Sequence, residues 1–274
     1  MLFRGIVKKI ALCIPPIKRL YAETQCLRKI VDESALTLEK ENIRQKARLY
    51  HQEREKLLSL ENKKLNLGCG NSPLEGWTNI DGGDGKHFDP PGNDAVVKLD
   101  VFTAMAEIAD ASVSYITSEQ FFEHFTRQEG FKLLRECFRV LKKGGVIRTQ
   151  VPDLYITVKC YLDEWSSAPW KTIQLPHRLR HISGSQDPYA KLLPGETYLP
   201  SMFINNGFHM DGHKFLYDYE TLEQSLRLAG FSQIERCKFG NSRHEILRGI
   251  DKHDGGETGC SWIPHIALTV EATK

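Results

Sequence analysis

Short apolar runs recur along the chain from Lys63 to the C-terminus, separated by polar stretches. Runs of this kind, rich in β-branched residues, are typical of strands that are buried or nearly so. The runs are KLNL, WTNI, AVVKLD, SVSYIT, GGVIRTQV, FSQIERCKF and HIALTVEAT. Because helices fit between some of them, the pattern predicts an α/β fold, namely a Rossmann-like, doubly wound and mostly parallel sheet of seven strands.

Two of the intervening stretches carry the signals of amphipathic helices. The stretch 127–143 runs into a glycine pair, which is a good C-terminal stop. The stretch 219–230 follows a capping aspartate, Asp218, and ends in Gly230. The apolar positions expected to face the sheet are Phe131, Leu134, Phe138 and Leu141 in the first helix and Leu222, Leu226 and Ala229 in the second.

Residues 17–62 contain neither proline nor glycine and are dominated by good helix formers, so they predict one long helix. An approximate heptad of apolar positions runs along its first half, at Leu20, Leu27, Val31 and Leu38. A single helix cannot bury this stripe. A solvated spacer and a short coiled coil, which would join a homodimer or dock a partner through residues 20–60, both stay open. We therefore divide the chain into a helical extension, 1–62, and a domain, 63–274.

The start of the chain is basic, with Arg4, Lys8, Lys9, Lys18 and Arg19 and no acidic residue in positions 1–20. A proline pair interrupts its short apolar stretch and a small-residue cleavage site is missing, so it does not match a signal peptide. Contact with an anionic membrane face is one interpretation of this segment.

Composition and charge narrow the class of protein. The chain is 41% hydrophobic and 26% charged, which is ordinary for a globular protein. A net charge of +2 without a basic stripe argues against a nucleic-acid partner. The seven cysteines are scattered, so we expect neither a disulfide framework nor a zinc site. With no apolar run of about 18 residues, we expect a cytoplasmic protein, acting in one interpretation at the inner face of the membrane.

The segment KLNLGCGNSPLEGWTNID, residues 64–81, places a glycine loop between two expected strands. Gly68 and Gly70 lie just beyond the carboxyl end of a strand, where open α/β sheets bind ligands. They allow a sharp bend and a close approach of the ligand. The third glycine of a dinucleotide-binding loop is absent, and Asp81 follows Gly68 by 13 residues instead of about 20. The loop therefore suits a nucleoside with a small charged tail better than a pyrophosphate.

Two acidic residues end the next expected strands. Asp81 can accept both hydroxyls of a ribose, and Asp100 can orient an adenine edge. Either aspartate alone fits a turn or a helix cap equally well. The succession of a glycine loop, Asp81 and Asp100 at three strand ends favours a nucleoside site.

These features occur in an ordered set: LNLGCG, NID, LDV, SEQFFEHF and LLRECFRVLKKGGVIRTQVPD. Over residues 64–272 the chain resembles the class I S-adenosylmethionine-dependent methyltransferases, especially a subgroup associated with bacterial surface polysaccharides that has a shortened first helix. The resemblance implies S-adenosylmethionine as the cofactor. It also implies Gly68, Cys69 and Gly70 at the methionine part, Asp81 at the ribose, Asp100 and Val101 at the adenine, and Ser118 and Gln120 facing cofactor and acceptor.

Methyl transfer to an oxygen gains from a base that removes its proton. In SEQFFEHF, Gln120 stands where similar proteins often carry histidine, and a glutamine cannot act as a base. His124 and Asp153 are therefore candidate catalytic residues. The alternatives are that His124 forms a structural pair with Glu123 and that Asp153 is a helix cap.

Residues 165–212 are too long and too rich in proline and aromatic residues for a plain connection, so we expect a substrate lid there. Arg178 and Arg180 are candidates for binding a phosphate or carboxylate of the acceptor, with a solvated surface as the alternative.

The end of this stretch brings His209, Asp211 and His213 close together in the sequence. His213 is a further candidate base, and His209 and Asp211 are candidate contacts of the acceptor. Structural hydrogen bonding and metal ligation are the alternatives. Because no third, distant ligand is evident, we expect no metal site.

The sequence thus favours an enzyme that uses S-adenosylmethionine to methylate a hydroxyl or phosphate of a surface polysaccharide or its precursor. A methyltransferase for small natural products and a scaffold that has lost methyl transfer are the alternatives. Asp89-Pro90-Pro91 lies before the third expected strand instead of after the fourth, so we interpret it as a turn and not as a motif for methylating nucleic acids.

Overall fold

The structure is a computed structural model that describes residues 15–59, 64–82, 95–162, 200–209, 212–251 and 266–274. The chain separates into two compact units, Met1–Gln52 and Glu53–Lys274. Among the described residues, no helix combines the length and the apolar character that crossing a bilayer requires.

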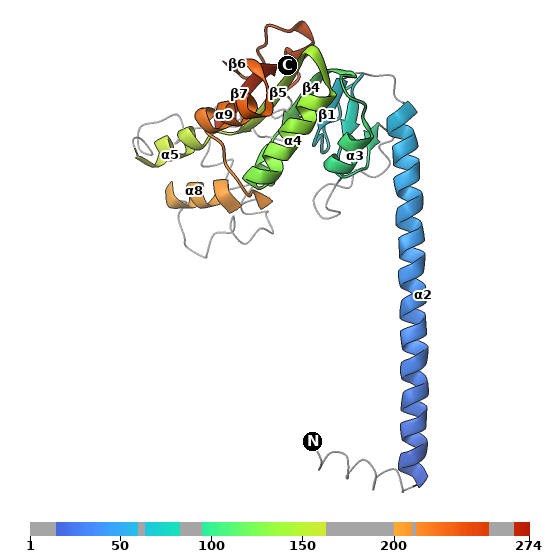
Figure 1. The fold of residues 1–274 in the computed structure, drawn as a ribbon. Coiled ribbons are helices and arrows are strands. Elements are labelled where there is room, and N and C mark those ends of the chain that lie inside the picture. The colour runs from blue at the N-terminus through green and yellow to red at the C-terminus, as the bar shows by residue number, and fades with distance from the viewer. Residues whose placement is uncertain (1–14, 60–63, 83–94, 163–199, 210–211, 252–265) are drawn as a thin grey trace. The chain divides into compact units, whose positions relative to one another are not determined.

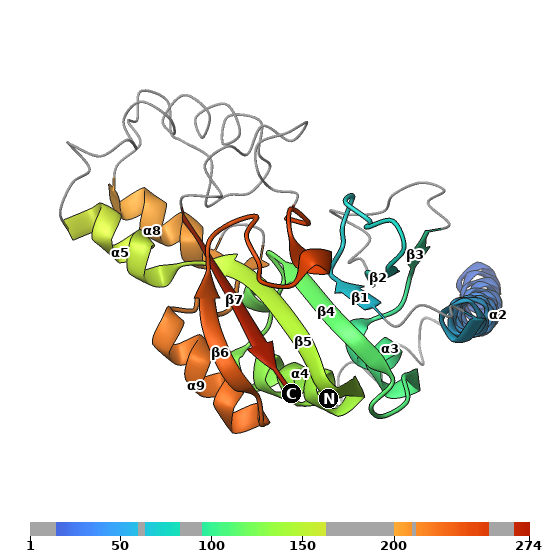
Figure 2. The same cartoon turned by 90° about the horizontal axis from the view of Figure 1, so that it is seen from above.

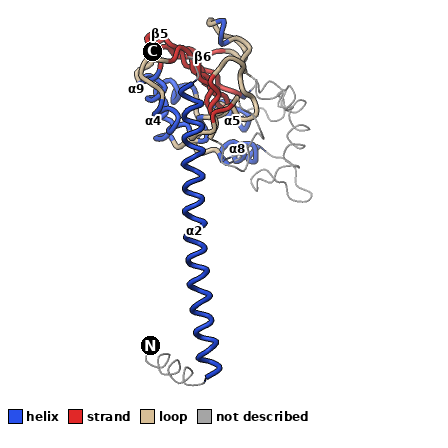
Figure 3. The backbone as a smooth tube through the Cα atoms, turned by 90° about the vertical axis from the view of Figure 1, so that its right-hand side faces the viewer, coloured by secondary structure: helices blue, strands red, loops and turns tan. Residues whose placement is uncertain are grey.

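The first unit consists of most of helix α2, Pro15–Ser59, which confirms the long helix predicted from the sequence. Its 45 residues extend about 67 Å at 1.5 Å per residue, and Figure 3 shows it as one continuous helix. The helix begins at a proline pair, which is tolerated in a first turn because the N–H that proline lacks would have no helical partner there. The heptad residues Leu20, Leu27, Val31 and Leu38 are 61–64% exposed, so the described chain leaves this stripe uncovered.

The second unit is built on a sheet of seven strands, the number predicted, in the order β3-β2-β1-β4-β5-β7-β6. The strands are β1 (Lys64–Leu67), β2 (Thr78–Ile80), β3 (Val96–Val97), β4 (Val113–Glu119), β5 (Leu141–Pro152), β6 (Ser232–Cys237) and β7 (Ala267–Thr273). The first five are parallel, and β7 is antiparallel to both of its neighbours. Because the strand order reverses between β1 and β4, their carboxyl ends form the switch point at which such sheets bind ligands (Figure 2).

The described helices of this unit form one layer and one pair. The layer on one face of the sheet consists of α3 (Val101–Glu107), α4 (Arg127–Val140) and α9 (Tyr219–Ala229), which pack side by side (Figure 1). The pair consists of α5 (Leu154–Leu162) and α8 (Pro200–His209), which pack against each other. In this layer, α4 contacts β5, and α9 contacts β6 and β7.

Local sequence signals explain where α4 and α9 begin and end. Thr126 and Glu129 form a capping box at the start of α4, each side chain bonding the other's backbone N–H. Asp218 caps α9 by accepting from Thr221 N, and Gly230 ends it in a left-handed conformation, both as predicted.

The buried face of α4 differs from our prediction. Its buried residues are Gly130, Leu133, Leu134, Cys137 and Val140. Phe138 is half-buried, and its ring packs edge-on against that of Phe231, which follows α9, with 5.2 Å between the ring centroids. Leu141 opens β5 instead of continuing the helix, since it pairs with Val113 of β4.

The connection from β1 to β2 contains no helix within residues 64–82. This agrees with the short first connection expected from the sequence. Leu74 and Trp77 instead pack with Val146 and Leu247 to form a small apolar cluster on the sheet. Segment 240–251 therefore covers this part of the sheet through Leu247.

A buried ion cluster fixes segment 240–251 on the sheet. The fully buried Arg148 of β5 lies 2.6 Å from a carboxylate oxygen of Asp251 and 2.6 Å from one of Glu271. Its Nη1 also donates to the carbonyl of Asn241. These bonds pair the three charged groups inside the domain and place Asp251 at the edge of the switch point.

The last turns of α2 belong to the second unit and are fastened to its edge. Arg54 Nε donates to Glu107 of α3 at 2.8 Å, and Lys56 Nζ donates to the carbonyl of Val96 in β3 at 2.6 Å. Leu57 is buried.

Candidate active site

The glycine loop after β1 has a conformation that requires glycine. Gly68 and Gly70 have φ values of 66° and 49°, in the left-handed region that side chains disfavour. A Cβ on Gly68 would also overlap the ring of Phe121. Gly70 N donates to Asp81 Oδ2 at 2.7 Å, which ties the loop to the residue after β2. The loop is therefore a tight bend at the switch point, as the sequence predicted.

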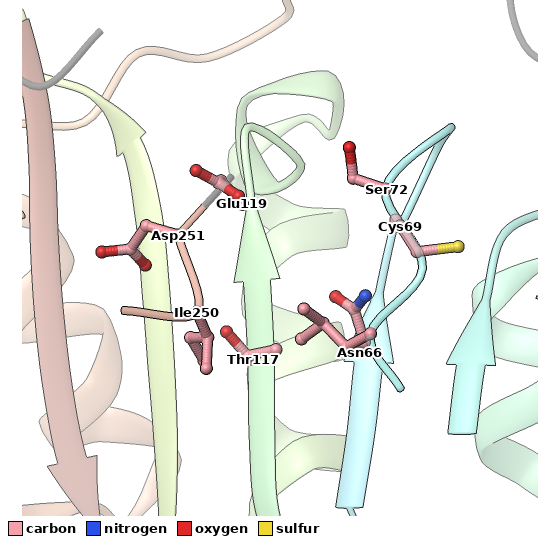
Figure 4. Close-up of a pocket in the computed structure, with 9 residues that line it drawn as sticks. Asn66, Cys69, Ser72, Thr117, Glu119, Ile250 and Asp251 are labelled. Carbon is pink, nitrogen blue, oxygen red and sulfur yellow. The ribbon is translucent and has the colours of Figure 1, made fainter. Parts of the chain in front are cut away.

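A small hollow, partly open to solvent, lies beside this bend. Figure 4 shows its walls: one comes from β1 and the loop, one from the end of β4, and one from segment 250–251. The lining residues are Asn66, Gly68, Cys69, Ser72, Leu74, Thr117, Glu119, Ile250 and Asp251. Because Asn66 pairs with Thr117 in the parallel register, the two strands present polar side chains to the hollow together.

Several of these residues were not predicted from the sequence. Thr117 and Glu119 alternate with Ser118 along β4, so they lie on the opposite face of the sheet from it. Ser118 instead donates to Thr149 Oγ1 of β5 at 2.9 Å and is buried. The alternation of side chains along β4 was a signal that could have separated the two faces, whereas Asp251 reaches the hollow only through its contact with Arg148.

The two aspartates expected at the nucleoside are already engaged by backbone groups. Asp81 accepts from Gly70 N, and Asp100 Oδ1 caps α3 by accepting from Phe102 N and Thr103 N. Val101, the first residue of α3, is buried. Neither aspartate is among the described residues that line the hollow.

The ends of β2 and β3 nevertheless run close together. A Cβ on Gly82 would lie 2.9 Å from Asp100 Cα. Residues 83–94, which follow Gly82, lie outside the described part of the chain. The ribose and adenine roles of Asp81, Asp100 and Val101 therefore stay predictions.

Gln120 occupies a strained position at the carboxyl end of β4. Its φ is 50°, which is uncommon for a residue other than glycine and costs energy. Its backbone N–H donates to the backbone carbonyl of Gln150 at 2.9 Å. Strain of this kind concentrates at functional sites, and the position of Gln120 beside the ligand stays a prediction.

Cys69 is a buried residue of the glycine loop. Burial, and secondly the charge of Asp81, raise the pKa of its thiol to about 12. A thiol with this pKa stays protonated near neutral pH and is a poor nucleophile. The thiol of Cys69 is therefore not a candidate nucleophile.

The structure brings two predicted catalytic residues together from distant parts of the sequence. The rings of His124 and His213 are 5.1 Å apart between centroids. His213 Nε2 lies 4.0 Å from Oε1 of Glu123, in the short helix η1 (Phe122–His124). Lys214 N donates to the carbonyl of Glu123 at 2.7 Å, which joins the two segments. His213 Nδ1 lies 2.7 Å from the carbonyl of Gly207, so this nitrogen is the donor.

Glu123 is the residue of this cluster that sequence reasoning undervalued. Its side chain is fully buried, and neither carboxylate oxygen has a hydrogen-bond partner among the described residues. Burial raises the pKa of its carboxyl to about 8. A buried carboxyl without a partner is costly, and such groups occur where a ligand or a proton is handled.

The remaining predicted residues are placed differently. Asp153 caps α5 by accepting from Tyr155 N at 2.9 Å, and it forms an ion pair with Arg236 at 2.6 Å. These contacts agree with the capping alternative. His209 is exposed at the end of α8. Arg178, Arg180, Asp211 and most of the lid expected over 165–212 lie outside the described residues.

One protein family and several solved structures are similar to this chain. Residues 86–149 match the sequence model of a family described as "Methyltransferase domain". No curated protein matches the chain.

Solved structures of similar fold include three methyltransferases. A SAM dependent methyltransferase from Archaeoglobus fulgidus is 17% identical, with 77% of this chain and 85% of that chain covered and a TM-score of 0.42. An S-adenosylmethionine dependent methyltransferase from Mesorhizobium loti is 13% identical, with coverage of 77% and 90% and a TM-score of 0.41. Phosphoethanolamine N-methyltransferase 2 from Haemonchus contortus, in complex with S-adenosyl-L-methionine, is 14% identical, with coverage of 77% and 48% and a TM-score of 0.39.

Likeness at these identities and TM-scores carries no argument about activity. The assignment rests on the family model, which covers the segment from before β3 into β5, and on the strand order of the sheet. The mostly parallel sheet of seven strands agrees with the fold predicted from the sequence, and β7 is inserted antiparallel between β5 and β6. Residues 86–149 therefore match a methyltransferase domain, set in a Rossmann-like, mostly parallel sheet of seven strands.

Proposed function

We propose that this enzyme methylates a hydroxyl or phosphate oxygen of a surface polysaccharide or of its precursor. The observation that supports an oxygen acceptor most is the cluster of Glu123, His124 and His213. It follows Phe121 in the chain, and the ring of Phe121 lies against Gly68 of the glycine loop. Phe121 thus connects the cluster, along the chain, with the bend that we propose for the cofactor.

The described residues fit S-adenosylmethionine. At Gly68 the ring of Phe121 fills the space that a side chain would take, and Gly68, Cys69 and Ser72 of the loop line the adjoining hollow. Glu119 lines the adjoining hollow, and its negatively charged carboxylate is suited to bind an ammonium group. The cofactor, when bound, supplies a methyl group on a positively charged sulfur. Gly68, Cys69, Gly70 and Asp81 would hold it, and their task is mainly to position it and to keep water out.

The acceptor oxygen must lose a proton as it bonds the methyl carbon, while the carbon–sulfur bond breaks and its electron pair stays on sulfur. A histidine can take this proton. Because His213 donates from Nδ1 to the carbonyl of Gly207, its Nε2 is the atom able to accept. We propose His213, with His124 beside it, as the residues on the acceptor side, and Asp153 only as a positioning residue.

The proposed contacts of the acceptor and the proposed location follow from the sequence, and Arg178, Arg180 and Asp211 lie outside the described residues. Arg178 and Arg180 would bind an acidic group of the glycan, and His209 and Asp211 would contact its hydroxyls. We place the enzyme in the cytoplasm, where α2 and the basic start of the chain would hold it at the inner membrane face. The exposed stripe of α2 would form a homodimer or dock a partner of the synthesis machinery.

A labelling experiment tests the acceptor. The full chain is incubated with S-adenosylmethionine labelled on its methyl group and with three sets of acceptors: lipid-linked glycan precursors, free oligosaccharides, and small hydroxylated or carboxylated natural products. We expect label in the glycans that survives mild alkali, as a methyl ether does and a carboxyl methyl ester does not. The Asp81→Ala variant is the control. Label only in the small molecules, or only in an alkali-labile form, would replace the glycan by the small-molecule alternative.

A further inference from the structure

The side chains of Glu123, His124 and His213 each offer one metal-ligand atom, and these atoms lie within 4.8 Å of one another. Two of them come from η1 and the third from the segment after α8, almost ninety residues later in the chain. Two imidazoles and a carboxylate are a ligand set that divalent transition metals favour, with coordination positions left for other ligands. His213 thus lies near Glu123 and His124, two candidate ligands that the sequence did not connect with it.

Glu123 points independently to a cation. Its carboxylate is fully buried, is directed toward His213, and has no hydrogen-bond partner for either oxygen among the described residues. Leaving a buried acceptor unpaired costs roughly 1–3 kcal/mol, and more for a charged group. Two backbone N–H groups already bind its main-chain carbonyl, so the backbone is satisfied and only the side chain lacks a partner.

The orientation of His213 fits a metal ligand. Its Nδ1 donates to the carbonyl of Gly207 at 2.7 Å, and Nε2 lies on the side of the ring that faces Glu123, 4.0 Å from Oε1. Histidines that bind metals usually donate their other ring nitrogen to a carbonyl or carboxylate, which fixes the ring and raises its basicity. The carbonyl of Gly207 is such a partner.

We propose that Glu123, His124 and His213 bind one divalent transition-metal ion beside the cofactor site. Ligand distances of about 2.0–2.2 Å would require the three atoms to close up by about 1 Å from their present separations. An ion of the Zn²⁺ or Co²⁺ kind suits two imidazoles, whereas Mg²⁺ prefers oxygen ligands. This inference departs from our expectation from the sequence that no metal is bound.

The role of such an ion rests on the proposed function. An ion held next to the acceptor would attract its hydroxyl or phosphate oxygen and make loss of the proton easier. In that case the two histidines act as ligands, and the acceptor oxygen itself is activated at the metal. Binding of the ion, however, can be measured without any acceptor.

The test is a titration of the full chain, first treated with a chelator, with Co²⁺, whose visible absorption reports imidazole ligation. Zn²⁺ is then added as a competitor, and Mg²⁺ is titrated separately. The variants are Glu123→Gln and His213→Gln, each checked for folding by circular dichroism. His244→Gln is the matched control, because His244 is another half-buried histidine of the same unit, outside the cluster.

We expect one Co²⁺ per chain, displaced by Zn²⁺ and not by Mg²⁺, with affinity at least about tenfold lower in both cluster variants and unchanged in His244→Gln. Absence of a one-to-one complex, or equal binding by all four proteins, would overturn the proposal. Binding of S-adenosylhomocysteine is measured on the same samples. If the cofactor product binds and the metal does not, this inference fails alone; if the metal binds and the cofactor product does not, the proposed function fails instead.

Discussion

Replacing Gly68 with alanine tests whether the bend after β1 holds the cofactor. Gly68 has a φ of 66°, and an added Cβ would overlap the ring of Phe121. Gly76 provides a matched control eight residues later in the chain. Its φ is 72°, but the nearest atom to an added Cβ is Lys64 Nζ at 3.9 Å, so alanine there meets backbone strain without an overlap.

The two substitutions differ in expected magnitude. Left-handed backbone costs alanine about 1–2 kcal/mol relative to glycine, and this applies to both positions. Overpacking against the Phe121 ring adds about 1–3 kcal/mol at Gly68 only. Gly76→Ala should therefore lower the free energy of unfolding by about 1–2 kcal/mol and Gly68→Ala by about 2–5 kcal/mol. Movement of the bend should also weaken cofactor binding at least about tenfold, or 1.4 kcal/mol.

Urea unfolding and calorimetric titration with S-adenosylhomocysteine measure both effects. We expect Gly76→Ala to bind as the wild type does and Gly68→Ala to bind more weakly. Equal losses of stability in the two variants would show that Phe121 does not press on the bend. Unchanged affinity in a folded Gly68→Ala variant would refute the placement of the cofactor there.

Three further predictions concern the acceptor side, the ion cluster and the long helix. His213→Ala should lower turnover roughly a hundredfold while cofactor affinity is retained; normal turnover would remove His213 from the site. Arg148→Ala should cost about 3–5 kcal/mol in urea unfolding because it leaves two buried carboxylates unpaired, whereas Arg227→Ala, in an exposed helical pair, should cost under about 0.5 kcal/mol; similar losses would contradict this. Sedimentation should show a concentration-dependent dimer that Val31→Glu abolishes, and a monomer at high concentration would count against it.

The strands and the glycine loop were predictable because their signals are local. β-branched runs, a glycine with positive φ and a capping aspartate each act within a few residues, so β1 to β7, Gly68 and Asp218 were expected correctly. The long helix was predictable for the same reason, since α2 depends on helix propensity and on the absence of glycine.

The remaining features depend on packing between distant segments. Asp251 reaches the hollow because the buried Arg148, 103 positions away, binds it. The isolation of Glu123 arises where η1 meets the segment around His213, and nothing near SEQFFEHF in the sequence indicates that segment. The inward face of α4 was misjudged because Phe138 contacts Phe231, which is 93 positions away in the chain, and is only half-buried. Such contacts become visible only when the topology is known.

Asp81 provides the most direct test of the central claim, that the bend after β1 and the carboxylate tied to it bind S-adenosylmethionine. The measurement is the free energy of unfolding with S-adenosylhomocysteine at one hundred times its dissociation constant. We predict a gain of about 2.7 kcal/mol for the wild type and none at the same concentration for Asp81→Ala, which loses the carboxylate that now accepts from Gly70 N. A wild-type protein whose stability does not change with the ligand, or an Asp81→Ala variant that gains as much as the wild type, would contradict the account.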